Sequence, residues 1–214
     1  GYTTSQEGNN FTNTISGTTK VEGTKTWVDD GAEHDNASEI TITLSRQSKK
    51  EGAKEEIVAD ATPSWTGDTY KFENLPKYDS EGYEYEYTVS ETKLPEGYTS
   101  SQEGNNFTNT KTGKTEVVGT KTWVDGGKSH TNAREVKLTL TRTSKNVTAA
   151  ETVAATPEWD ENTYKYRDLD QYDSKGAPYT YHVSEQKISG YTTSQEGNNF
   201  TNTISGTTKV EGTK

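Results

Sequence analysis

The chain contains no cysteine and no methionine, and only 5 of its 214 residues are proline. The absence of cysteine excludes disulfide bonds, thiolate zinc sites and cysteine nucleophiles. Hydrophobic residues make up only 26% of the chain, and no apolar run approaches the roughly 18 residues of a membrane-spanning helix. We therefore expect neither one large hydrophobic core, nor membrane insertion of this segment, nor a signal peptide at its start.

Positive charge is also scarce, because 33 acidic residues stand against 23 basic ones and the formal net charge is -10. Such a surface repels phosphate groups, so nucleic acids and anionic membranes are not expected as partners. Aromatic and β-branched residues are plentiful instead, with 13 tyrosines, 4 tryptophans and 38 threonines. This composition suits short strands that pair across a pleated sheet, and it predicts an all-β protein.

Internal repeats organise the chain. Residues 1–25 read GYTTSQEGNNFTNTISGTTKVEGTK, and residues 190–214 repeat the same letters. A close copy, GYTSSQEGNNFTNTKTGKTEVVGTK, begins at Gly97, so the repeat spacing is 96 and then 93 residues. Each repeat predicts one structural unit.

The phase of these repeats predicts two complete modules, module 1 at residues 17–111 and module 2 at residues 112–204. Residues 1–16 are then expected to be the last strand and linker of a preceding module. Residues 205–214 are expected to be the first strand of a following one. The parent protein is therefore expected to be a longer array.

Strand signals within a module are short and evenly spaced. Ile40, Ile42 and Leu44 alternate with threonines, as Val136, Leu138 and Leu140 alternate with polar residues, which predicts strands with one buried face. Further strands are predicted at residues 56–59, 69–73, 83–91 and 106–110. About seven strands in a module of this length predict tandem immunoglobulin-like β-sandwiches.

Modules with so few apolar residues usually need a further stabilising link. A metal site is poorly supported, because the acidic loop of Asp29, Asp30, Glu33 and Asp35 is largely lost in module 2, where Asp125 is followed by Gly126, Gly127 and Lys128. Histidine occurs only at His34, His130 and His182. We therefore expect no metal and no cofactor.

Three other polar residues recur in the same order in both modules: Lys25, Glu91 and Asn109 in module 1, and Lys121, Glu185 and Asn202 in module 2. The lysines lie in the motif GTKTWVD, the glutamates in YTVSE or YHVSE, and the asparagines in FTNT. Nearly the whole chain resembles the CnaB family, the B-type repeat of collagen-binding surface adhesins of Gram-positive bacteria. The resemblance is carried by these motifs and by ENLPKYDSEGYEYEYTVSE and GYT. Module 2 departs from module 1 at Asp170, where module 1 has Pro76, and at Ala177-Pro178, where module 1 has no proline.

The resemblance implies a prealbumin-like sandwich in which a first-strand lysine and a last-strand asparagine form a spontaneous isopeptide bond, assisted by an acidic residue on a middle strand. By position, it implies a Lys25–Asn109 bond assisted by Glu91, and a Lys121–Asn202 bond assisted by Glu185. Asn13 and Lys214 occupy the matching positions of the truncated modules, and neither can complete a bond within one such chain. The alternative is that the recurring residues form ordinary salt bridges and a strand-end amide.

The chemistry of these residue types suits such a bond. An amine attacks an amide only when it is deprotonated, and burial in an aromatic setting favours the neutral lysine. Trp27 and Trp123 lie two residues after the lysines and therefore on the same strand face. A buried, protonated glutamate can polarise the asparagine carbonyl and relay protons to the departing ammonia. The reaction occurs once per module, so the chain is not expected to be an enzyme.

These observations predict stalk or spacer repeats of a Gram-positive adhesin or pilus-like fibre, extracellular and anchored to the cell wall. The expected partners are neighbouring repeats of the same array and, through the truncated ends, other chains associated head to tail. The alternative function is a repeat that binds a host protein or glycan directly. No host ligand is identified by the residues.

Overall fold

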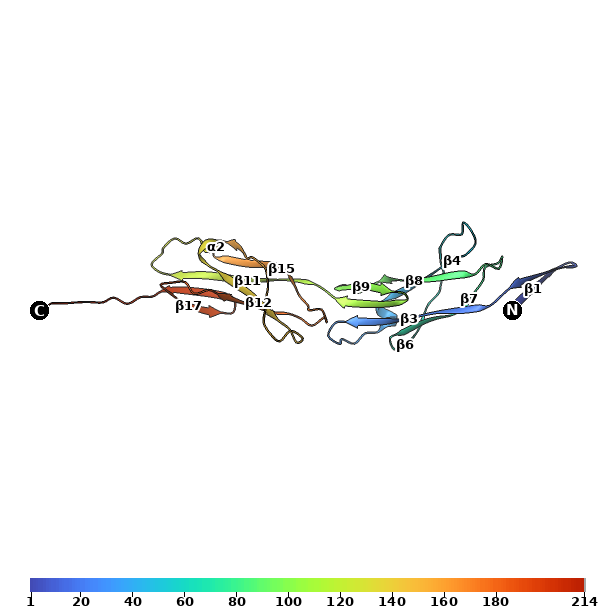
Figure 1. Ribbon diagram of the computed structural model, residues 1–214, viewed down its shortest axis with the longest axis horizontal. Helices are drawn as coiled ribbons and strands as arrows, with labels where there is room; N and C mark the ends of the chain where they lie inside the picture. The colour runs from blue at the N-terminus through green and yellow to red at the C-terminus, as the bar shows by residue number, and fades with distance from the viewer. Residues whose placement is uncertain (214) are drawn as a thin grey trace. The chain divides into compact units, whose positions relative to one another are not determined.

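The structure is a computed structural model that describes residues 1–213. It divides into two compact units, Gly1–Lys111 and a second that begins at Thr112. Figure 1 shows each unit as a set of strands, the first drawn from blue to green and the second from green to red. No helix among residues 1–213 has both the length and the apolar character needed to cross a membrane.

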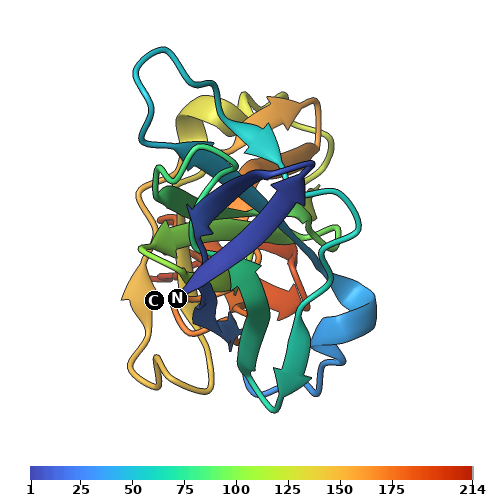
Figure 2. The ribbon, with the colours of Figure 1, turned by 90° about the vertical axis from the view of Figure 1, so that its right-hand side faces the viewer.

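The first unit opens with a hairpin of β1 (Tyr2–Glu7) and β2 (Asn10–Ile15), visible in dark blue in Figure 2. Module 1 follows with β3 (Thr18–Val28), α1 (Asn36–Glu39), β4 (Thr41–Ser48), β5 (Glu56–Ile57), β6 (Ser64–Thr66), β7 (Thr69–Pro76), β8 (Tyr85–Lys93), β9 (Tyr98–Glu103) and β10 (Asn106–Lys111). These strands form a five-stranded sheet in the order β6-β7-β3-β10-β9 and a three-stranded sheet in the order β5-β4-β8.

The second unit repeats this arrangement. It contains β11 (Lys114–Val124), α2 (Asn132–Glu135), β12 (Leu138–Thr143), β13 (Glu151–Thr152), β14 (Glu158–Asp160), β15 (Thr163–Asp170), β16 (Thr180–Glu185), β17 (Tyr191–Glu196) and β18 (Asn199–Ile204). The sheet orders are β14-β15-β11-β18-β17 and β13-β12-β16. The order matches that of module 1 strand for strand.

Each core lies between the two sheets of its module. In module 1 the five-stranded sheet contributes Tyr70, Phe72 and Phe107, and the three-stranded sheet contributes Leu44 and Val89, all of them buried. Module 2 buries Tyr164, Tyr166 and Phe200 against Leu140 and Val183 in the same way. The alternation in sequence therefore becomes a sandwich with one apolar interior, which confirms the predicted fold class.

A close approach holds β3 against the turn between β9 and β10. The Tyr70 hydroxyl donates a hydrogen bond to the Asn105 carbonyl at 2.5 Å. A Cβ atom added at Gly23 would fall inside van der Waals contact with that same carbonyl. Glycine is therefore required at this point of β3, and Gly119 has the same surroundings in module 2.

The structure differs from the sequence expectation at both ends. Residues 1–16 form two strands rather than one, because Gly8 adopts a φ of 60° and turns the chain between Glu7 and Asn10. Residues 205–213 form no regular element, since they have no neighbouring strand to pair with. Lys214 lies outside the described residues. The assignment of these ends to neighbouring modules stays a prediction.

Candidate functional site

The candidate site lies where the first and last strands of a module run side by side. β3 and β10 are parallel, with Lys25 opposite Phe107 and Trp27 opposite Asn109. Opposite and alternate positions share one face of a sheet, so Lys25 and Asn109 point to the same side on adjacent strands. β11 and β18 repeat this register with Lys121 opposite Phe200.

The acidic residue reaches the site from the other sheet. Glu91 lies on β8, and its Oε1 atom accepts hydrogen bonds from Lys25 Nζ at 2.8 Å and from Asn109 Nδ2 at 3.0 Å. The Ser100 hydroxyl donates to the second carboxylate oxygen, Oε2. One carboxylate therefore contacts both the amine and the side-chain amide.

Module 2 contains the same arrangement. Lys121 Nζ donates to Glu185 Oε2 at 2.6 Å, and Asn202 Nδ2 donates to Glu185 Oε1 at 2.8 Å. The Thr193 hydroxyl donates to Glu185 Oε1 at 3.3 Å, in the place of Ser100. All six residues singled out in sequence for the two complete modules are thus brought into contact, in two separate groups of three.

Both groups are sealed from solvent. The side chains of Lys25 and Lys121 have no exposed surface, and those of Glu91 and Glu185 are 2% and 1% exposed. The amide oxygens of Asn109 and Asn202 are buried and have no hydrogen-bond partner. Buried polar atoms are nearly always paired, so these two oxygens are exceptions that call for an explanation.

Burial is the largest influence on the Lys25 amine, and it lowers the pKa of that group, although the hydrogen bond and charge of Glu91 act in the opposite direction. The pKa of Lys121 is lowered for the same reason against the opposing effect of Glu185. A larger share of each lysine is therefore held as the neutral amine, the form that attacks an amide.

Asn13, the described residue of the truncated modules, stands apart from both groups. Asn13 lies on β2 and is exposed, and its Oδ1 atom accepts a hydrogen bond from the Thr4 hydroxyl at 2.6 Å. Lys214 lies outside the described residues. The structure thus assembles the site in the two complete modules and not around Asn13.

Sequence reasoning missed a second polar cluster beside each site. His34, which was set aside as a poor metal ligand, stacks on the ring of Trp27 and lies between Asp29 and Glu39. His130 occupies the same place on Trp123. The signal was present in the sequence, because these residues recur at equal spacing in both loops. Among residues 1–213, no group of three or more His, Cys, Asp or Glu side chains is arranged so that it could hold a metal ion.

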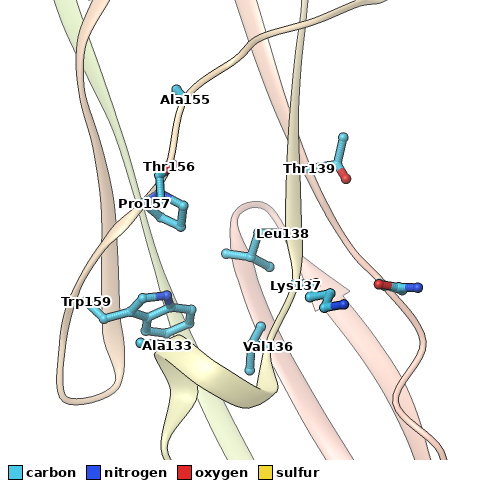
Figure 3. Close-up of a pocket in the computed structure, with 10 residues that line it drawn as sticks. Ala133, Val136, Lys137, Leu138, Thr139, Ala155, Thr156, Pro157 and Trp159 are labelled. Atoms are coloured by element: carbon cyan, nitrogen blue, oxygen red, sulfur yellow. The ribbon is translucent and has the colours of Figure 1, made fainter.

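A groove opens on module 2 between β12 and the segment that enters β14. Figure 3 shows Pro157 and Trp159 on one side facing Leu138 on the other. Its volume is about 530 Å³. A smaller groove of about 200 Å³ lies at the matching place in module 1, between Ile42 and Trp65. The groove therefore recurs, with different dimensions, in both modules.

The sandwich topology and the two buried Lys–Glu–Asn groups define this chain as a pair of tandem repeat modules of one structural class. The family model of the Cna protein B-type domain matches residues 21–110 and again residues 117–203. The chain therefore belongs to the Cna B-type domain family, as the resemblance in sequence predicted.

Known proteins similar to the chain include the collagen adhesin of Staphylococcus aureus, which is 32% identical over 216 residues. That match covers 95% of this chain and only 17% of the adhesin. A crystal structure of two B repeat units, B1B2, of the collagen binding protein of Staphylococcus aureus is 28% identical, with a TM-score of 0.45, and the match covers 95% of this chain and 54% of that one.

The shaft pilin SpaA of Lactobacillus rhamnosus GG is 15% identical, with a TM-score of 0.26 and coverage of 90% of this chain and 100% of the pilin. The family and the adhesin relative together identify the chain as a tandem B-type repeat of the kind found in surface adhesins.

Proposed function

We propose that the two modules are stalk repeats of an extracellular Gram-positive adhesin or pilus-like fibre, and that each module is stabilised by an isopeptide bond it forms itself. The bonds join Lys25 to Asn109 and Lys121 to Asn202. The observation that carries this proposal is the contact of one buried carboxylate with both an amine and an amide, found independently in each module.

The reaction balances without any added reagent. The neutral Lys25 amine attacks the side-chain carbonyl carbon of Asn109, a new C–N bond forms, and the bond to Nδ2 breaks. Glu91 takes the proton that the attacking nitrogen loses and delivers one to the departing nitrogen, so that ammonia leaves. Because the amine and the amide lie on adjacent strands, folding supplies the proximity that a separate catalyst would otherwise provide.

Burial favours the reactive protonation state. An ammonium and a carboxylate in a dry interior lose their hydration, whereas a neutral amine beside a carboxylic acid holds the same number of protons without separated charge. A protonated Glu91 can also donate to the Asn109 carbonyl oxygen once that amide has turned by 180°, which polarises the carbonyl toward attack. The unpartnered oxygens of Asn109 and Asn202 supply the acceptors for this step.

A bond between β3 and β10 suits a mechanical role. The two strands are the first and the last of the module, so force transmitted along an array enters and leaves through them. A covalent tie between neighbouring strands carries this force before the hydrogen-bonded sheet does. Repetition of the module then extends the array, as in other linear repeat proteins. The chemistry is a single turnover within each module, and we propose no external substrate.

An intact-mass measurement of the purified chain tests the proposal. We expect a mass below that of the sequence by two molecules of ammonia. Glu91→Ala should remove one of these losses, with peptide mapping placing the remaining link between Lys121 and Asn202. Glu185→Ala is the matched control and should retain only the link of module 1. A wild-type mass equal to that of the sequence would exclude both bonds.

The recurring groove favours a second candidate function, direct binding of a host protein. β13 pairs with β12 only at Thr141 and Arg142, so within the described residues the Leu138 end of β12 has an edge free of strand pairing, as sheet edges that take up extended peptides do. Immobilised fibrillar collagen is a suitable probe, because the relative is named a collagen adhesin. The stalk proposal predicts no binding. Binding that Trp159→Ala abolishes would instead favour this candidate.

A further inference from the structure

The tryptophan beside each reacting lysine is held in place from several directions. Lys25 Nζ lies over the Trp27 ring, 4.7 Å from its centroid. His34 stacks on the same ring with the centroids 3.7 Å apart and the planes at 7°. Tyr98 packs edge-on at 5.1 Å, and Trp27 Nε1 donates to Asn36 Oδ1 at 2.7 Å. Because the imidazole covers one face of the indole at contact distance, the amine lies over the other face.

His34 is itself fixed by two carboxylates. Its Nδ1 atom lies 2.7 Å from Glu39 Oε2, and its Nε2 atom contacts Asp29 Oδ2. Ionised carboxylates only accept hydrogen bonds, so both ring nitrogens donate and the ring is an imidazolium. The Tyr98 hydroxyl donates to the same Asp29 oxygen at 2.9 Å. A charged histidine is therefore locked flat against the tryptophan.

Module 2 builds the same cluster with different neighbours. The Trp123 and His130 rings stack at 3.7 Å and 2°, and Lys121 Nζ lies 4.6 Å from the Trp123 centroid. His130 lies 2.7 Å from Glu135 and 2.6 Å from Asp125.

Between the two loops the cluster is retained, while five of the seven other positions from 30 to 38 change. Asp29, His34, Asn36 and Glu39 correspond to Asp125, His130, Asn132 and Glu135. By contrast, Asp30, Ala32, Glu33, Asp35 and Ser38 are replaced by Gly126, Lys128, Ser129, Thr131 and Arg134. The cluster is thus kept as a unit.

We propose that His34 and His130 are positioning residues for cross-link formation: each clamps its tryptophan against the reacting lysine and so keeps the amine aimed at the asparagine. The inference rests on the isopeptide bonds proposed above. It adds that the rate of bond formation, and not only the stability of the loop, depends on the charged imidazole. Misplacement of a reacting group by about 1 Å is enough to slow a reaction by about 100-fold.

The stacking of the charged His34 ring on Trp27, called the clamp below, is expected to weaken at high pH. Burial acts to lower the pKa of His34, but the hydrogen bonds from the ring to Glu39 and Asp29 outweigh it and the pKa is raised. The titratable groups that face the ring are Asp29 at the end of β3, Glu39 on α1 and the Tyr98 phenol on β9. Because the folded state favours the charged ring, the clamp is complete below the ordinary histidine pKa and is lost as pH rises through the raised value.

Cell-free synthesis of the full chain, with samples quenched in acid, tests the inference through the linked fraction of each module, read by peptide mass mapping. His34→Ala should slow linking in module 1 by about tenfold or more, while module 2 of the same molecule links at the wild-type rate. His34→Arg should restore the rate, because a guanidinium stacks on aromatic rings, pairs with carboxylates and stays charged.

The pH profile separates positioning from a purely structural role. The ratio of the wild-type rate to the His34→Arg rate cancels the titration of the lysine. This ratio should fall as the pH rises through the raised pKa of His34, which lies above the ordinary histidine value of about 6.5. Equal rates for wild type and His34→Ala in a chain that links would overturn this inference alone, whereas a wild type that never links overturns the cross-link proposal. If circular dichroism shows that His34→Ala is unfolded, the ratio of the wild-type rate to the His34→Arg rate becomes the test. A ratio that does not change with pH contradicts the inference.

Discussion

At the scale of single residues, the site lowers the stability of the folded state because it buries polar groups without full hydrogen bonding. The side chain of Lys25 has no exposed surface, and the Asn109 amide oxygen has no partner. Each such group destabilises the folded state, because the hydration lost on folding is not replaced. The proposed bond removes the ammonium altogether and leaves one new N–H that can still donate to Glu91.

Tyr166 provides a simple test of this cost. Its hydroxyl is buried and has no hydrogen-bond partner, and burial raises its pKa. Module 1 has Phe72 at the corresponding position. Tyr166→Phe should therefore stabilise module 2 by about 1 kcal/mol, because it deletes an unsatisfied hydroxyl without leaving a large cavity.

Chemical denaturation of the two-module chain measures this change. Phe72→Tyr is the matched control and should destabilise module 1 by a similar amount. A loss of stability in Tyr166→Phe would mean that the hydroxyl makes a favourable interaction after all.

At the scale of elements, hydrogen bonds to turn residues stabilise the connections between strands. Asp173 lies in the turn between β15 and β16 and accepts hydrogen bonds from the Ser144 hydroxyl, the Asn146 amide and the backbone N–H groups of Lys175 and Ala177. Burial acts to raise its pKa, but these donors outweigh burial and lower it to about 2. The ionised carboxylate is therefore part of the folded turn.

The pH dependence follows from this shift. A carboxyl group with a lowered folded-state pKa stabilises the protein above its unfolded value, near 3.8, and the contribution is lost as pH falls toward about 2. Module 2 should lose stability over this window, as followed by thermal melting at stepwise lower pH. Asp173→Asn should be less stable at neutral pH and should flatten the dependence. An unchanged acid profile in that variant would show that other carboxylates dominate.

Elements also explain which parts of the fold could be predicted. The strands containing Leu44 and Leu140 were predicted because their apolar residues alternate. β9 was missed because only Tyr98 of its six residues is even partly buried, so it has no alternation to detect. β6 was missed because it has three residues. Short or fully polar strands are held by their neighbours rather than by their own pattern.

At the scale of the whole molecule, each module has a small hydrophobic core, so a covalent link can supply a large part of its free energy of unfolding. The proposed links close loops of about 84 and 81 residues, for which the chain-entropy model gives about 4–5 kcal/mol each. This is a large share of the stability of a small domain. The contribution acts mainly by restricting the unfolded chain.

Lys25→Ala should therefore lower the melting temperature of module 1 and make it sensitive to protease, while module 2 is unaffected. The substitution also leaves the buried Glu91 carboxylate without its cationic partner, which is itself destabilising. The double variant Lys25→Ala/Glu91→Ala is therefore the control that separates the effect of losing loop closure from the effect of an unpaired buried charge. Calorimetry and limited proteolysis measure both. A melt equal to that of the wild type would show that no link stabilises the module.

The sequence by itself determined the all-β class, the repeat spacing and the order of lysine, glutamate and asparagine, because alternation and repetition can be read along the chain without knowledge of its three-dimensional contacts. Only the tertiary structure decided that β3 and β10 are parallel with Lys25 opposite Phe107, that Glu91 comes from the other sheet, and that His34 covers Trp27. These contacts join residues far apart in the chain or across a loop, and the packing of two sheets around one core, rather than any local pattern, sets their distances.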